Sequence, residues 1–131
     1  MSTLESIAAE LPNGFHDSSL RRVVVDYVDR RATLALNVWV GDLKAATDAE
    51  REAYRSSDVT ISGLLWCIIE PPRTTDYRSA DGLWIDAGPV SNLKNKPAIP
   101  TVPDDAFAWW IFVREWNAFI YVAGTDGSFS A

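Results

Sequence analysis

The single histidine of this chain, His16, is the residue type best suited to proton transfer near neutral pH. Asp17 follows it directly, and a carboxylate beside an imidazole can orient the ring, as in acid–base sites. Adjacent residues on an extended segment point to opposite sides, so we do not expect Asp17 to be the direct partner of His16. The sequence favours a structural role, in which Asp17 caps the turn of residues 13–17 and His16 packs or bonds to the backbone.

The sequence lacks the common catalytic and metal-binding patterns. It contains no G-x-x-x-x-G-K-[ST] loop, no G-x-G-x-x-G and no G-x-S-x-G elbow. One cysteine and one histidine exclude the usual Cys/His zinc sites, and no stretch resembles a calcium loop. We therefore expect no cofactor and no metal, and the sequence identifies no catalytic residue. Acids near strand ends could pair for glycosidase chemistry, but no spacing selects a pair: these are Asp17, Asp26, Asp86, Asp104, Asp105 and Asp126.

Tryptophan is the most unusual part of the composition, with six residues in 131. Trp109 and Trp110 are consecutive, so in a regular strand one faces the core and the other faces solvent, a second layer or a partner. Exposed aromatic rings are typical of interface anchors and ligand platforms, although a second layer covering the sheet would also explain them. The binding residues expected from these patterns are Trp39, Trp84, Trp109, Trp110, Tyr77, His16 and Asp17.

Length and charge limit the class of protein. A chain of 131 residues is typical of one domain, residues 1–131. Its 12 basic and 18 acidic residues give a net charge of -6, which argues against a nucleic-acid partner. The N-terminal sequence does not resemble a secretory signal, and no apolar run is long enough to span a membrane, so we expect a cytoplasmic protein. Cys67 lies in an apolar run and is interpreted as a small buried hydrophobe.

Alternation of apolar and polar residues predicts two antiparallel hairpins. The first covers residues 20–40, with Leu34, Leu36 and Val38 toward the core, and the second covers residues 107–123. Residues 59–70 are apolar on both faces, which predicts a long central strand in which Gly63 marks a bulge or bend.

One short helix is expected outside these strands. Thr47 and Glu50 have the spacing of a capping box, which predicts a short helix over residues 47–56 at the edge of the fold. A short helix over residues 3–10 is also possible, followed by a turn at Pro12-Asn13-Gly14.

Residues 71–103 hold six of the seven prolines and only one short strand candidate, Leu83-Trp84-Ile85. Long irregular segments inside compact domains are often functional, and prolines lower the ordering cost of binding. This segment is either a partner-facing or ligand-facing surface or a stiff cover over the sheet.

Together these elements predict a single mainly β domain, an antiparallel sandwich or strongly curled sheet with one short peripheral helix. The alternative is a small open β-barrel with the Pro-rich segment across its mouth.

The segment from Leu11 to Asp17, with the strand that ends at Asp26-Tyr27, and the later segment from Arg114 to Ile120 resemble small uncharacterised bacterial proteins. Some of these are similar to polymorphic-toxin immunity proteins that carry a Phe-His-Asp turn before their first strand. The resemblance implies an acidic cytoplasmic β domain that works by binding a protein. It transfers no catalytic residues.

Three functions remain open at this stage. The leading hypothesis is a non-enzymatic protein-binding domain, because the chain is acidic, rich in Trp and without catalytic motifs. The second is a Trp-lined pocket for a small ligand. The third is an enzyme, of hydrolase type, that uses His16 with a carboxylate.

Overall fold

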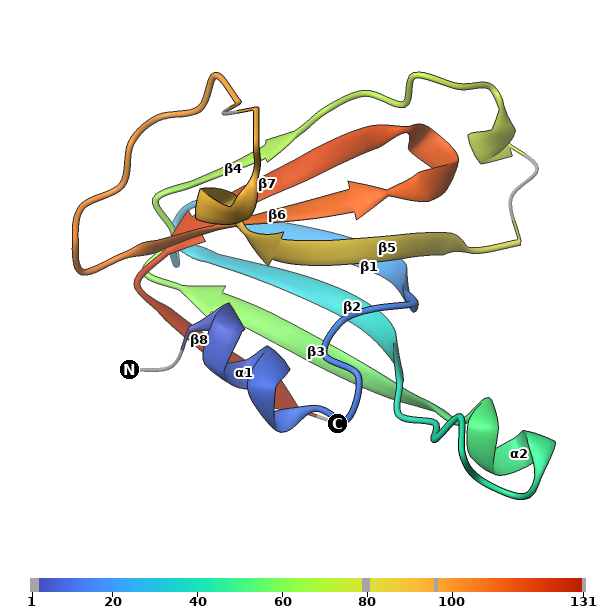
Figure 1. Ribbon diagram of the computed structural model, residues 1–131. Helices are drawn as coiled ribbons and strands as arrows, with labels where there is room; N and C mark the ends of the chain where they lie inside the picture. The colour runs from blue at the N-terminus through green and yellow to red at the C-terminus, as the bar shows by residue number, and fades with distance from the viewer. Residues whose placement is uncertain (1–2, 79–80, 96, 131) are drawn as a thin grey trace.

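The computed structural model describes residues 3–78, 81–95 and 97–130. Within these residues, eight strands form one antiparallel sheet that is not closed into a barrel, in the order β4-β7-β6-β5-β1-β2-β3-β8 (Figure 1). The fold is therefore mainly β, and its curled sheet matches the predicted class, whereas the barrel alternative is not observed. The strands are β1 (Ser18–Asp26), β2 (Arg31–Trp39), β3 (Tyr54–Ser62), β4 (Trp66–Ile69), β5 (Leu83–Pro89), β6 (Phe107–Val113), β7 (Ala118–Gly124) and β8 (Asp126–Ser130).

Both predicted hairpins are confirmed. β1 pairs with β2, and β6 pairs with β7. Leu34, Leu36 and Val38 are at most 3% exposed, so the alternation identified the inward face of β2 correctly. Trp109 is buried and Trp110 is half-buried on the other face of β6, as consecutive strand residues must be.

The long strand predicted over residues 59–70 is wrong in its bounds and in its place. The strand begins at Tyr54, ends at Ser62, and resumes as β4, which lies at an edge of the sheet. Gly63 breaks it with a φ of 59°, a conformation that side chains disfavour. β7 and β8 are separated at Thr125, whose N–H donates to Ser62 O at 3.1 Å. The two broken strands run side by side and curl the sheet.

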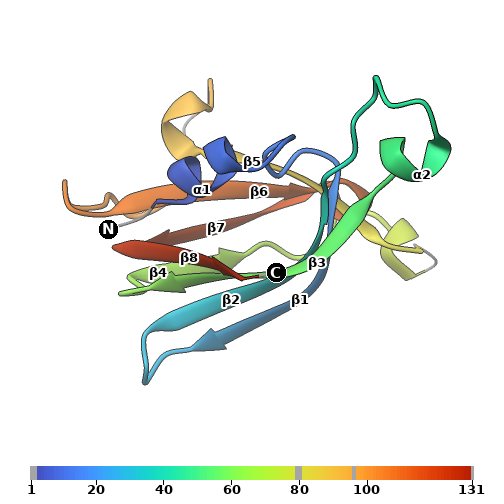
Figure 2. The same cartoon turned by 90° about the horizontal axis from the view of Figure 1, so that it is seen from below.

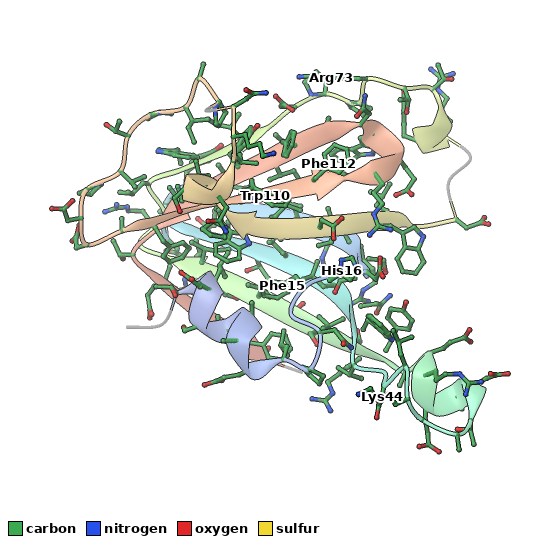
Figure 3. All side chains as sticks on the ribbon, viewed as in Figure 1. Phe15, His16, Lys44, Arg73, Trp110 and Phe112 are labelled. Carbon is green, nitrogen blue, oxygen red and sulfur yellow. The ribbon has the colours of Figure 1, made fainter. Side chains whose placement is uncertain are left out.

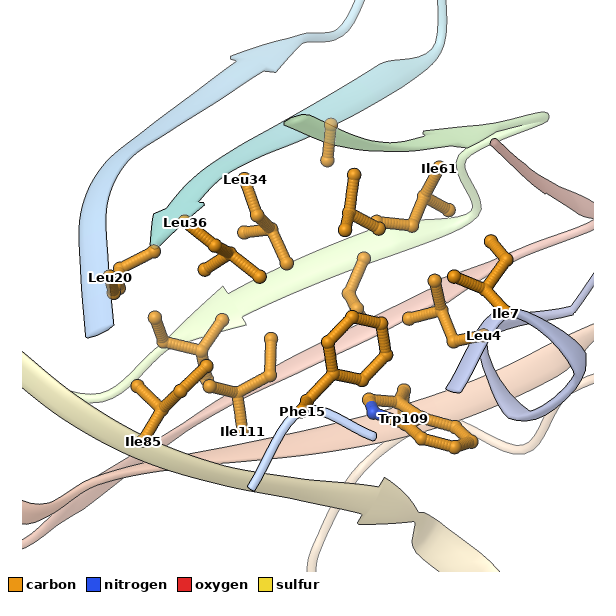
Figure 4. Packing of buried hydrophobic residues seen from close by; sticks show 14 of the residues in the cluster. Leu4, Ile7, Phe15, Leu20, Leu34, Leu36, Ile61, Ile85, Trp109 and Ile111 are labelled. Atoms are coloured by element: carbon orange, nitrogen blue, oxygen red, sulfur yellow. The ribbon is translucent and has the colours of Figure 1, made fainter. Parts of the chain in front are cut away.

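The core fills the inside of this curl (Figure 4). Its sheet residues include Leu36, Ile61, Ile85 and Ile111, and the helix α1 (Leu4–Glu10) closes it (Figure 2). Leu4 and Ile7 of α1 are buried, and the side chain of Phe15, from the turn before β1, packs beside them.

The helix expected over residues 47–56 is only one turn, α2 (Asp48–Arg51). Its Thr47 cap is present and its edge position is as predicted, but Tyr54 pairs with Trp39 in the sheet and ends the helix early. The weaker prediction, residues 3–10, is the longer helix. Strand pairing prevailed because residues 47–56 offer no wide apolar stripe to bury.

The Pro-rich segment 71–103 is more ordered than expected. It contains β5, which lies between β1 and β6 and so joins the two hairpins of the sheet. Three short 3-10 turns, Asp76–Arg78, Val90–Asn92 and Arg114–Trp116, flank or follow it. Residues 79–80 and 96 of the segment lie outside the described residues. The predicted strand candidate, Leu83-Trp84-Ile85, is confirmed as the first part of β5. Its continuation through Asp86-Ala87-Gly88-Pro89 was not predicted, because these residues have the composition of a turn.

We predict that Leu36→Ala lowers the free energy of unfolding by about 2–5 kcal/mol, the usual cost of truncating a buried leucine. Leu36 is 2% exposed at the centre of β2. Urea denaturation measures the loss, and Val24→Ala, at a site that is 49% exposed, is the control that should stay near wild type. An unchanged midpoint for Leu36→Ala would contradict this assignment of the core.

We further predict that Gly124→Ala destabilises the protein by about 1–3 kcal/mol, the usual cost of overpacking. A methyl group at this position would come within 2.4 Å of Ile61 Cγ2 and 2.9 Å of Ser62 O. Gly82→Ala is the matched control, because there the nearest contact is 3.9 Å away. Equal thermal unfolding of the two variants would show that the curl tolerates a side chain at position 124.

Candidate functional site

The candidate site lies on the outer face of the sheet, where β5, β1, β2 and β3 run side by side. Trp84 pairs with Ser19, Ser19 with Asn37, and Asn37 with Ser56, so small side chains follow Trp84 across the sheet. Trp39 and Tyr54 are paired at the ends of β2 and β3. Because Ser19 and Asn37 are small, the Trp84 ring from β5 can contact the Tyr54 ring from β3 across them.

These rings form a hollow of about 370 Å³, which we call the aromatic hollow. The Tyr54 and Trp84 rings meet edge to face, with centroids 6.0 Å apart. Leu43 is 72% exposed, Tyr54 44% and Trp84 37%, so the lining is open to solvent. The lining residues are Asp17, Trp39, Leu43, Arg51, Glu52, Tyr54 and Trp84.

Hydrogen bonds hold this lining in place. Trp39 Nε1 donates to Arg51 O at 2.8 Å, which ties the loop after β2 to the ring. Gly41 lies under the same contact, where a Cβ would come within 2.0 Å of Arg51 O, so only glycine fits. The Trp84 backbone N–H donates to the Glu115 carboxylate at 2.6 Å, which anchors the start of β5.

A network of four ionisable side chains borders the hollow. His16 Nδ1 lies 2.7 Å from Asp86 Oδ1, and His16 Nε2 lies 3.2 Å from Asp17 Oδ2. Arg114 Nη2 contacts Asp17 at 2.6 Å and Asp86 at 3.4 Å. The hydrogen bond to Asp17 raises the pKa of Arg114, and the charge of Asp86 adds to this effect. The turn before β1, strand β5 and the turn after β6 are thereby joined.

The predicted roles of His16 and Asp17 are wrong in two respects. Asp17 contacts His16 directly, because its φ of 54° is left-handed and the segment is not extended. It also binds Arg114 rather than capping the turn, and His16, labelled in Figure 3, binds Asp86 from β5. The turn itself is confirmed, with Gly14 at a φ of 56° and Asn13 Nδ2 donating to Gly41 O at 2.8 Å.

Both ring nitrogens of His16 lie near carboxylates of this chain, Nδ1 near Asp86 and Nε2 near Asp17. Asp17 and Asp86 are the acids that the fold brings together, and Arg114 and His16 engage both. Among the described residues, no group of three or more His, Cys, Asp and Glu side chains could hold a metal ion.

The other predicted binding residues lie elsewhere. Trp109 is 4% exposed in the core, so it cannot anchor a partner. Trp110 belongs to a separate aromatic cluster with Phe112 and Phe119. Tyr77 is exposed on its 3-10 turn, with the Arg78 guanidinium 5.8 Å from the ring centroid. The aromatic hollow therefore unites Trp39, Trp84 and Asp17, with His16 at its border.

Sequence reasoning missed most of the lining. Tyr54 and Glu52 were assigned to a helix, and nothing local indicated that Leu43 or Arg114 would join the site. Trp39 pairs with Tyr54 because β2 and β3 are adjacent antiparallel strands. To predict this pairing, one would have to recognise that the residues between the two strands form a loop and not a long helix.

Two further observations concern the rest of the chain. Cys67 is half-buried, and this burial raises the pKa of its thiol, which agrees with its interpretation as a small hydrophobe. No helix in the described part of the chain is long and apolar enough to cross a membrane.

No protein-family model matches the chain, and the search of curated proteins gives no match. Among solved structures, the crystal structure of an uncharacterized protein from Neisseria gonorrhoeae is similar. The similarity has a TM-score of 0.49 and 14% sequence identity, over 89% of this chain and 93% of that chain.

We predict that His16→Asn changes the free energy of unfolding by less than about 1 kcal/mol, because exposed ion pairs contribute little. The His16 side chain is 60% exposed. Urea denaturation in low salt and in 1 M NaCl measures this effect, and the small difference from wild type should shrink as salt screens the charges. A loss above about 2 kcal/mol at both salt concentrations would show that His16 organises the turn.

Proposed function

We propose that this chain is a non-enzymatic protein-binding domain that contacts its partner through the aromatic hollow. The observation that supports the proposal best is the gathering of three large exposed apolar side chains, Leu43, Tyr54 and Trp84, in one place. Tryptophan and tyrosine are the residues that most often anchor protein interfaces. Charged side chains surround them, as in the polar rim of such an interface.

The openness of the hollow favours a protein partner over a small ligand. Its volume, about 370 Å³, is near the lower end for small-molecule sites, which enclose most of the ligand surface. Leu43, Tyr54 and Trp84 are themselves between 37% and 72% exposed, so they form a shallow surface rather than an enclosing wall. A shallow, preformed surface suits a protruding element of another protein.

The proposal extends to an immunity-like role, in which the domain neutralises a protein by binding it in the cytoplasm. The Phe15-His16-Asp17 turn, which carries the resemblance to immunity proteins, supports this role because Asp17 lines the hollow. The net charge of -6 supports a basic partner, since complementary charge speeds encounter. The same charge argues against nucleic acid as the partner.

Affinity capture with matched variants tests the proposal. We expect a partner from the source cell to be retained by wild type and reduced at least about tenfold by the Tyr54→Ala/Trp84→Ala double variant, in the range of hot-spot residues. The control is Tyr27→Ala/Val28→Ala, which removes two exposed side chains (73% and 91%) from the β1–β2 turn.

Quantitative mass spectrometry compares the three samples, and circular dichroism verifies that the variants are folded. A partner that both double variants retain would contradict the proposal. A partner lost only with Tyr27→Ala/Val28→Ala would place the interface on the β1–β2 turn instead.

A further inference from the structure

The charges in the aromatic hollow are not balanced. Of its two carboxylates, Asp17 is engaged by Arg114 and His16. Glu52 is exposed. Its backbone N–H donates to Asp48 O at 2.9 Å, but its carboxylate makes no hydrogen bond or ion pair with any residue that the structure describes. Arg51 also lines the hollow, but its guanidinium donates to Ala45 O at 2.8 Å and pairs with Asp48. One carboxylate therefore faces the hollow without a cation.

The aromatic rings add to the negative potential. The face of an aromatic ring is electron-rich and attracts a cation, most strongly for tryptophan. Tyr54 lies near both carboxylates: burial raises the pKa of its hydroxyl, and the negative charges of Asp17 and Glu52 raise it further. Two kinds of negative surface, ring faces and carboxylates, thus converge in one place.

We propose that the aromatic hollow receives a basic side chain of the protein partner, and that this side chain is arginine. Its planar guanidinium stacks on the face of Trp84, with the Tyr54 ring at its side because the two rings lie at 64° to each other, and it pairs with Glu52. Lysine is the weaker match, because an ammonium group neither stacks as a plane nor binds a carboxylate through two parallel hydrogen bonds. This inference rests on the proposed function, since it names the chemical group that the protein-binding surface recognises.

The geometry supports entry of a long side chain without rearrangement. Edge-to-face contact already holds Tyr54 and Trp84 together, and hydrogen bonds hold Trp39 and the start of β5. A preformed hollow lowers the ordering cost of binding. Leu43, at the exposed side of the hollow, can cover the methylene groups of an arginine that enters.

A titration with N-acetyl-arginine amide, followed by nuclear magnetic resonance, tests this inference directly. We expect saturable shifts in the signals of Trp84 and Tyr54, and about tenfold weaker binding of N-acetyl-citrulline amide, which has the same shape without the charge. N-acetyl-lysine amide should bind between these two. Equal binding of the arginine and citrulline probes would overturn the inference.

Two charge variants locate the site. Glu52→Gln should weaken binding of the arginine probe about two- to fivefold, the range of an exposed ion pair. Glu10→Gln, at an exposed position of α1, makes the same change in net charge and should have no effect. Equal effects of the two variants would show that only the overall charge attracts the probe.

The outcomes separate this inference from the proposed function. If capture of the partner requires Tyr54 and Trp84 but the arginine probe does not bind, the proposed protein-binding surface stands and the inference that it receives an arginine is overturned. If the probe binds at Glu52 while no captured protein depends on the hollow, the basic-side-chain site stands and the proposed interface fails.

Discussion

The fold depends on a close approach between two backbones at Gly124. Here β7 passes over the end of β3, with room for no Cβ beside Ile61 and Ser62. Gly63, the residue that follows β3, has a positive φ and lets the chain continue toward β4 in a new direction. Because both strands bend at the same place, one sheet curls enough to enclose its own core. α1 and Phe15 then close that core without a second sheet.

The curl also determines which surface is left for function. The core cluster packs on the inner face, and Tyr54 and Trp84 on the outer face stay exposed. Trp84 and Tyr54 arise from strands that are not neighbours, and they meet because Ser19 and Asn37 between them are small. The aromatic hollow is thus a consequence of strand order as much as of aromatic content.

Electrostatics divides the acidic residues of this region into two groups. Asp17 and Asp86 form ion pairs with Arg114 and His16, and this network ties β5 to the turn before β1. The backbone pairing of β1 with β5 covers only Ser18 to Leu20. Glu52 is left without such a partner, beside the rings. The first group joins the segments that border the hollow, and Glu52 stays exposed beside the rings.

The sequence by itself determined the parts of the structure that depend on local pattern. The period of two along β2 and β6 predicted which faces are buried, because successive side chains of a strand point to opposite sides. It also placed Trp109 and Trp110 on different faces and the turn at Asn13-Gly14. Composition and the missing motifs made protein binding the leading hypothesis for the function, beside a small-ligand pocket and an enzyme. None of these required knowledge of residues distant in the chain.

Only the tertiary structure decided the rest, because it depends on contacts between distant residues. Arg114 reaches Asp17 across 97 positions of sequence, and the left-handed backbone of Asp17 that permits this contact has no local signal. Strand β5 is held by its neighbours rather than by its own composition. Tyr54, which the sequence placed in a capped helix, pairs with Trp39 in the sheet instead. For both strands, the free energy of pairing with distant partners outweighed the local preference of the chain.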